Sequence, residues 1–267
     1  MAKKFYRVGD GIRFFPQTSA PSDPENGDMY YDDTLTIFRF RENGAWVALG
    51  GGNRGLVSVQ IFTASGTWNK PLGIRHVVVE LAGGGGGSGG TAATGPGQSS
   101  ASDGGGGGGY SKKFIDVSAI SSVTVTIGAG GTAGTAGVNN GGAGGTTSFG
   151  AHCSATGGAG GAGGAVQATD GFNGAGSNGG TGTGGDLNLD GGAGQAGFFS
   201  TSANDCLGGV GGGNKLAPPN RHGGINSSGI AGKLYGGGAS GASNNANNGS
   251  RAGSAGEDGI VIVWEYA

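Results

Sequence analysis

Cysteine, proline, charged residues and long apolar runs are all scarce in this chain of 267 residues. Its two cysteines, Cys153 and Cys206, are too few for a disulfide scaffold. We interpret both as small buried thiols, with a single disulfide as the alternative, in a chain folded in a reducing cytosol. No apolar run approaches the ~20 residues of a membrane span. The first ten residues lack the apolar segment of a secretion signal, so we expect neither feature.

The charge balance argues against partners that are recognised by charge. Fifteen Lys and Arg residues oppose seventeen Asp and Glu residues, which gives a formal net charge of −2. Such a chain has no basic field to attract nucleic acid or anionic lipid. We therefore expect no nucleic-acid partner.

Catalytic and metal-binding motifs are also missing. The sequence has no GxxxxGK[ST] phosphate loop and no serine in the context of a nucleophile elbow. Its three histidines have no metal-ligand spacing. Asp186 and Asp190 are four residues apart but lack the ligand density of a calcium loop, which leaves calcium binding as a minor alternative. The sequence predicts a protein that is not an enzyme and that has no cofactor or metal.

Glycine, in contrast, is abundant and unevenly placed. The chain contains 70 glycines, of which ten precede Gly83 and sixty lie from Gly83 onward. Flexible linkers and ordinary glycine-rich loops are the simplest readings of such composition. The strands that surround the glycine-rich region argue against both readings.

Residues 1–52 predict a small β module. Asn43 and Gly44 lie between two apolar runs, which is a strong hairpin signal. Apolar side chains alternate on both faces of the first arm, and an isolated hairpin is only marginally stable. We therefore expect the module to associate with copies of itself through three aromatic residues, Phe38, Phe40 and Trp46.

Residues 53–267 predict a second domain in which strands enclose the glycine-rich region. Residues 56–82, 110–129 and 259–266 are rich in β-branched and aromatic residues, which favour strands. The last strand follows more than a hundred glycine-rich residues and needs a sheet to join. Its best partners are the early strands, so the glycine-rich region becomes an insertion whose two ends meet.

The glycines of residues 128–256 recur every third residue. Examples are the series at 128, 131, 134 and 137 and the series at 176, 179, 182 and 185. A period of three is typical of an extended threefold helix, and the near absence of proline excludes collagen. Such helices make no internal hydrogen bonds, so their backbones must bond sideways to close neighbours. The sequence predicts a bundle of polyglycine II helices over about 128–256, with GGAGGAGGA at 157–165 as an inner rod.

The predicted fold is therefore all-β: a small N-terminal β-hairpin module, then a β-sandwich-like sheet that encloses or caps a polyglycine II bundle. Islands of larger side chains interrupt the glycine runs and become the turns at the ends of the bundle. Loops on a rigid scaffold can form a recognition surface, although they can also merely cap the rods. The candidate receptor-binding residues on these islands are Phe172, Phe198, Phe199, Asn220, Arg221, Tyr235, Asn244 and Asn245.

Two parts of the chain resemble bacteriophage tail proteins. Residues 21–50, with NGDMYYD and NGAWV, resemble a small β module that recurs in tail fibres. Residues 58–267 resemble the glycine-rich domain of phage tail proteins, and the match rests on four motifs: FTASGTW, VVVELAGGGG, TVTIGAGG and GIVIVWEY.

The resemblance implies a structural virion protein, a tail fibre or tail-tip adhesin that binds a host surface glycan or an outer-membrane protein. It implies localisation in the virion after synthesis in the host cytoplasm, a homotrimer, and attachment to other tail or capsid proteins through the N-terminal module. It names no binding residues. A capsid decoration or head-spike protein is the alternative, and a glycine-rich ice-binding protein is a more distant one.

Overall fold

The computed structural model describes residues 16–35, 37–49, 55–200 and 205–267. The chain forms two compact units, Met1–Gly55 and Leu56–Tyr266, which are described separately below. The expected boundary between residues 52 and 53 lies outside the described residues. The described residues contain strands, turns and extended segments but no helix, which confirms the all-β prediction.

The first unit contains one four-stranded sheet in the order β1-β2-β3-β4. Its strands are β1 (Pro16–Gln17), β2 (Met29–Asp32), β3 (Ile37–Glu42) and β4 (Ala45–Leu49). The predicted hairpin is confirmed, because β3 pairs antiparallel with β4 across Asn43 and Gly44. Both turn residues have positive φ angles, 48° and 78°, as a two-residue type I′ turn requires.

The three aromatic residues expected to drive association do not share one face of this sheet. Phe38 and Phe40 lie on the same face, because they are two residues apart on β3. Trp46 is paired with Arg41 and therefore lies on the opposite face, where its ring meets that of Tyr30 at 4.7 Å. The three residues thus lie on two separate faces, and their role in association stays a prediction.

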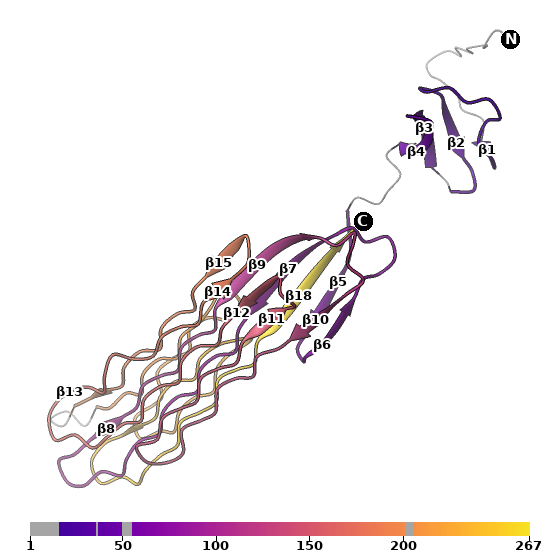
Figure 1. Ribbon diagram of the computed structural model, residues 1–267. Coiled ribbons are helices and arrows are strands. Elements are labelled where there is room, and N and C mark those ends of the chain that lie inside the picture. Colours follow the sequence, from indigo (N-terminus) through magenta and orange to yellow (C-terminus); the bar gives the residue numbers. More distant parts are fainter. Residues whose placement is uncertain (1–15, 36, 50–54, 201–204) are drawn as a thin grey trace. The chain divides into compact units, whose positions relative to one another are not determined.

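The second unit begins with a β-sandwich (Figure 1). One five-stranded sheet has the order β15-β9-β7-β18-β5, and the other has the order β14-β12-β11-β10-β6. The strands of the first are β5 (Leu56–Phe62), β7 (His76–Ala82), β9 (Tyr110–Asp116), β15 (Leu187–Leu189) and β18 (Ile260–Tyr266). The strands of the second are β6 (Gly66–Asn69), β10 (Ser122–Thr126), β11 (Thr147–Phe149), β12 (Cys153–Ala155) and β14 (Gly182–Thr183).

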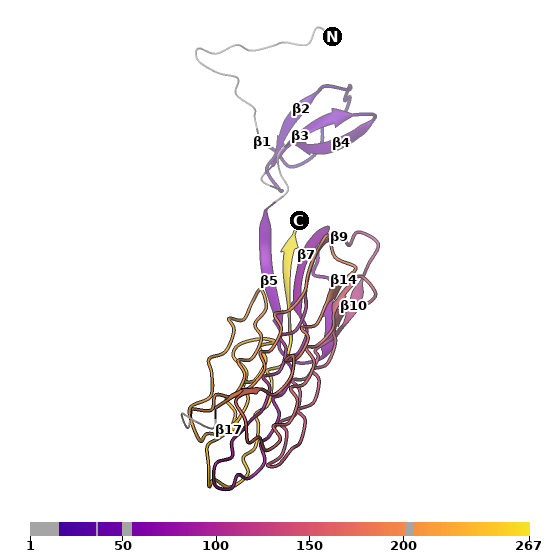
Figure 2. The ribbon, with the colours of Figure 1, turned by 90° about the vertical axis from the view of Figure 1, so that its left-hand side faces the viewer.

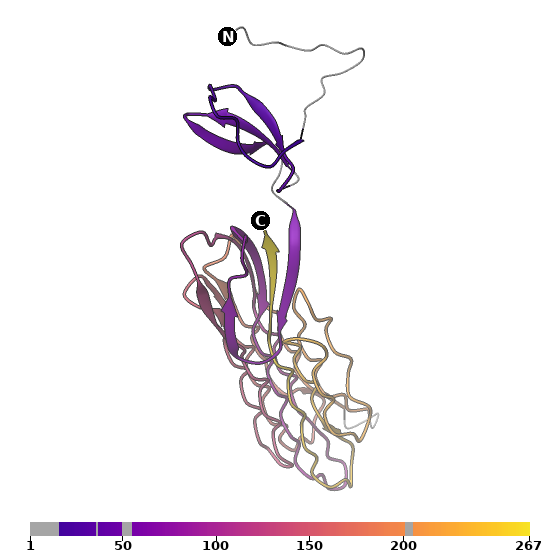
Figure 3. The same cartoon turned by 90° about the vertical axis from the view of Figure 1, so that its right-hand side faces the viewer.

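The C-terminal strand closes the sandwich as the sequence predicts. β18 lies between β5 and β7 and pairs antiparallel with both, so the two ends of the glycine-rich region meet at this sheet. Figure 3 shows the yellow β18 beside the purple β5. Residues more than 190 positions apart are thereby held in register.

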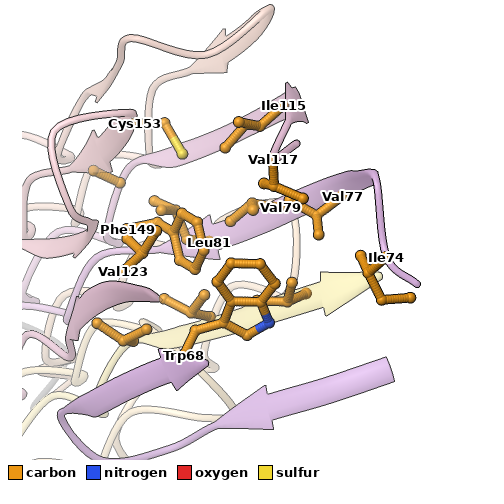
Figure 4. Close-up of a cluster of buried hydrophobic side chains, with 14 residues drawn as sticks. Trp68, Ile74, Val77, Val79, Leu81, Ile115, Val117, Val123, Phe149 and Cys153 are labelled. Carbon is orange, nitrogen blue, oxygen red and sulfur yellow. The ribbon is translucent and has the colours of Figure 1, made fainter. Parts of the chain in front are cut away.

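The hydrophobic core lies between the two sheets (Figure 4). Trp68 of β6 and Phe149 of β11 are fully buried at its centre, with ring centroids 5.7 Å apart. Alternate residues of β7 and β18 point at them from the facing sheet, as the period of two requires. Cys153 belongs to this core.

A buried carboxylate, which the sequence did not suggest, links β18 to β5 and β6 through hydrogen bonds. Glu265 of β18 is fully buried and accepts hydrogen bonds from three side chains. The donors are the hydroxyl of Ser58, the amide of Gln60 at 2.7 Å and the indole N–H of Trp68 at 2.7 Å. A buried charged group is tolerable because these donors replace its water.

Below the sandwich the chain runs back and forth as a bundle of extended segments, here called rods (Figure 1). Residues 83–91 form a central rod in which every third N–H donates to the same neighbour. The three series of donors go to residues 103–109, 139–145 and 251–257. Its carbonyls accept from residues 131–137, from residues 158–164 and from Ala239. Six backbone neighbours with a period of three define a polyglycine II lattice.

Residues 102–109 form a second central rod with the same pattern. Its N–H groups donate to residues 156–162, 192–195 and 236–242. Each residue of both central rods is buried. The predicted polyglycine II region of about 128–256 therefore begins too late, because it omits the two rods at the centre.

Residues 157–165 are not an inner rod, which corrects the prediction for GGAGGAGGA. Only Gly158, Gly161 and Gly164 of this rod are buried, whereas Ala159 and Ala162 are half-exposed. The glycines of the two central rods have no space for a methyl group. A Cβ built on Gly86 would lie 2.0 Å from the carbonyl oxygen of Ala159, so larger residues occur at only a few positions of these rods, such as Ser88 and Asp103.

Candidate binding surface

The bundle has a loop-bearing end, opposite the sandwich, which we call the tip. Six segments of the described chain turn there: residues 92–100, 135–140, 165–175, 196–207 (described to 200 and from 205), 222–228 and 243–250. The short strands β8 (Ser100–Ala101) and β13 (Gly171–Phe172) mark this end in Figure 1, and β17 (Ser243–Asn244) marks it in Figure 2. A fourth short strand, β16 (Phe198–Phe199), pairs with β13. The unit begins and ends far from the tip, because Leu56 pairs with Tyr266 at the other end of β18.

Three phenylalanines of the candidate set come together at the tip. β13 pairs antiparallel with β16, so Phe172 lies opposite Phe198, with ring centroids 5.4 Å apart. Phe172 is 68% exposed and Phe198 is half-buried. Phe199 points the other way into a small cluster with Ala101 and Cys206. The pair Phe172–Phe198 is thus an exposed aromatic surface on a rigid base, while Phe199 is part of that base.

A buried aspartate ties these two loops to the central rod. Asp103 is 2% exposed and accepts hydrogen bonds from the Asn173 amide at 3.2 Å and the Gly197 N–H at 3.0 Å. The sequence reasoning missed Asp103. Its only signal is that it is the single charged residue directly before the run of six glycines at 104–109.

The asparagines of the last tip loop are structural. The Asn244 amide is fully buried and donates to the carbonyl oxygens of Ala92 at 2.8 Å and Gly249 at 2.9 Å. Its oxygen accepts from Arg251 Nε at 2.6 Å. The Asn245 N–H donates to the Asn226 side chain at 2.6 Å. Asn244 and Asn245 were expected on the receptor-binding surface, but the structure buries both inside the loop, where the Asn244 amide bonds to backbone carbonyls.

Two of the remaining candidates, Asn220 and Tyr235, do not join the tip surface. Asn220 is buried, and its amide donates to the carbonyl oxygens of Ile230 at 3.2 Å and Ala231 at 2.7 Å. Arg221 is exposed beside it. Tyr235 lies in a turn at the sandwich end, since Gly236 bonds to Asp258 just before β18 begins. Tyr235 and Phe172 therefore lie at opposite ends of the bundle, and the prediction that they share one surface is wrong.

Two exposed apolar residues of the tip were missed. Val138 is 55% exposed and Ile225 is about half exposed, and each lies at the turn of a tip loop. A single apolar residue within a polar loop has no pattern that would mark it in the sequence. With Phe172, these side chains are the large exposed apolar groups of the described tip.

The described residues contain no group of three or more His, Cys, Asp or Glu side chains that could hold a metal ion. Asp186 accepts instead from the Phe114 N–H at 2.8 Å. Cys153 and Cys206 are free and buried, as expected, and burial raises the pKa of Cys153 to about 11. No helix long and apolar enough to cross a membrane occurs among the residues described.

Comparison with known proteins adds one finding. A family model described as a glycine-rich domain matches residues 61–266, which covers the sandwich and the whole bundle. No curated protein matches the chain.

Proposed function

Because this chain belongs to the glycine-rich domain family, we propose that it is a structural virion protein of a bacteriophage, a tail fibre or tail-tip adhesin. In this proposal the tip binds a receptor on the host-cell surface, either a glycan or an outer-membrane protein. The resemblance of residues 21–50 and 58–267 to phage tail proteins supports the virion assignment.

One observation carries the binding role. Six loops meet at one end of a backbone-bonded bundle, and the chain enters and leaves the unit at the other end. Loops held by a rigid scaffold lose little conformational entropy on binding. An exposed aromatic pair, Phe172 and Phe198, can stack on a sugar ring or fill a gap in a protein surface.

The first unit supplies the attachment in this proposal. Residues 1–52 bind other tail or capsid proteins, and the assembled protein is a homotrimer. Threefold display multiplies a weak single contact by avidity, so each tip needs only modest affinity. Deletion of residues 1–52 leaves the glycine-rich unit folded and removes it from the particle. Normal occupancy of the truncated protein on particles would assign the anchor elsewhere.

Adsorption of particles to host cells tests the tip. Particles carrying Phe172→Ser, Val138→Ser and Ile225→Ser together keep a folded protein, because these side chains are exposed. We expect their adsorption rate to fall at least tenfold. The matched control, Leu72→Ser with Leu234→Ser, removes exposed apolar side chains away from the tip and leaves adsorption unchanged. If the tip variant adsorbs normally, the tip is not the receptor site and a capsid decoration protein becomes the better assignment.

A further inference from the structure

The outer face of the β15-β9-β7-β18-β5 sheet carries a set of exposed large apolar residues away from the tip. Its strands alternate, so Val261, Val263 and Glu265 point into the core and the residues between them point outward. Ile61 is 61% exposed and Phe114 is 54% exposed on this outer face.

The register joins these side chains into continuous rows. One row crosses four strands through Val59, Trp264, Val78 and Phe114. A second row crosses all five strands, in the order Ile61, Ile262, Glu80, Lys112 and Leu187.

The side chains of these two rows share one face and are separated by the ~4.8 Å strand spacing. His76 extends the surface, since its ring stacks on Phe114 with centroids 5.1 Å apart. The two rows therefore form one patch, which we call the outer patch.

One edge of this sheet carries few of the features that usually block association. β5 is an edge strand, and its sequence LVSVQIF contains no charge and no proline, although its register with β18 is irregular between Glu265 and Tyr266. Natural edge strands usually carry lysine, proline or a bulge that prevents pairing or packing with another chain. An uncharged edge strand beside an apolar face is typical of a surface that is covered in the assembled protein.

Area and charge identify the partner. The exposed apolar residues of the outer patch and its ends are Leu56, Val57, Val59, Ile61, Phe114, Leu187 and Leu189. Together they present roughly 600 Å², at the upper end of the largest patch on a typical monomer. With its polar rim the patch approaches the ~800 Å² that each partner contributes to a standard interface.

The charges at the centre of the outer patch are paired with each other, because Lys112 Nζ lies 2.8 Å from Glu80 Oε1. Two identical patches therefore meet at their centres without like-charge repulsion. We propose that a second copy of this chain packs its own outer patch on this face. The contact joins the same surface of two subunits, so it pairs subunits of two different homotrimers, and it is independent of the first unit and of the tip.

Sedimentation equilibrium of the full-length protein tests the interface. The double variant Ile61→Lys with Phe114→Lys places charge at two exposed positions that the copies bury against each other. We expect the dissociation constant of the assembly to rise about 30-fold or more, as for loss of a central contact. Val138→Lys, an exposed apolar position at the tip, is the matched control and leaves the constant unchanged.

A milder variant guards against misfolding. Ile61→Ser with Phe114→Ser has no added charge, and we expect an intermediate increase in the dissociation constant with an unchanged melting temperature. A wild-type protein that forms monomers or single homotrimers, and nothing larger, at tens of micromolar overturns the proposal. So does a folded lysine variant that associates as tightly as the wild type, in which case the first unit or another virion protein covers the outer patch.

Discussion

Gly105→Ala is the sharpest test of the lattice. Gly105 lies in a central rod, and a Cβ at this position would be 2.1 Å from the carbonyl oxygen of Gly86. A carbon atom and a carbonyl oxygen normally approach to only ~3.3 Å. The two rods must therefore separate by about 1 Å, and both belong to the packed centre of the bundle. The φ angle of Gly105 is not positive, so the added methyl group is the only source of strain.

The cost follows from the hydrogen bonds that this separation breaks. The Gly86 N–H donates to Gly106 at 2.8 Å, and the Gly86 carbonyl accepts from Ala239 at 3.0 Å. Each buried group left without a partner costs about 1–3 kcal/mol. Loss of these two bonds thus removes about 2–6 kcal/mol from a total stability of about 5–15 kcal/mol. At about 2–4 °C per kcal/mol for a unit of this size, the melting temperature falls by about 4–24 °C.

Differential scanning calorimetry measures this shift. The control is Gly249→Ala, where a Cβ has no atom within 4 Å and the φ angle is not positive, so the same chemical change is nearly neutral. A Gly105→Ala protein that melts within 2 °C of the wild type would refute the idea that backbone-to-backbone contact holds the bundle together.

Three further predictions concern other parts of the second unit. In Gly161→Val a Cβ alone would lie 2.2 Å from the Asp103 carbonyl oxygen, so the two added methyl groups lower the melting temperature of this variant strongly. Ala162→Ser lies on the half-exposed side of the same rod and changes the melting temperature little. Equal shifts for the two variants would contradict the perimeter position of this rod. Glu265→Gln exchanges one acceptor oxygen for an amide donor that faces the donors of Gln60 and Trp68. We expect urea titrations to show a free energy of unfolding lower by about 1–3 kcal/mol. An unchanged urea midpoint would mean that the carboxylate is dispensable for stability. Burial raises the pKa of Cys153 to about 11, so at pH 8 a thiol reagent labels it only after denaturation, and labelling of the native protein within minutes would show that the core opens.

The sequence predicts the perimeter of the lattice better than its centre. A period of three is visible only where alanine, serine or threonine occupies an exposed side of a rod. The central rods have backbone neighbours on all sides, so they require glycine at nearly every position and show no period at all. The runs at 83–87 and 104–109 therefore look like featureless low complexity, although they are the most buried part of the bundle.

The hairpin at Asn43 and Gly44 and the closing strand are predictable because their signals are local. The roles of the buried carboxylates of Asp103 and Glu265 cannot be predicted in the same way, because their hydrogen-bond partners lie up to 207 residues away in the sequence. The islands of larger side chains are recognisable as turns, but successive turns alternate between the two ends of the bundle. An island can be assigned to the tip or to the sandwich end only when the number of rods before it is known. The sequence does not give this number, so it did not show that Phe172 and Tyr235 lie at different ends.

The central rods have a consequence for heat capacity. An ordinary core exposes apolar surface on unfolding, which raises the heat capacity and makes stability strongly temperature-dependent. Residues 83–91 and 102–109 instead expose peptide groups, which lower the heat capacity. The two contributions offset each other across this unit, so its stability curve is flatter than that of a protein with an apolar core. The stability that the bundle gains from backbone hydrogen bonds is retained on cooling, whereas hydrophobic stabilisation weakens.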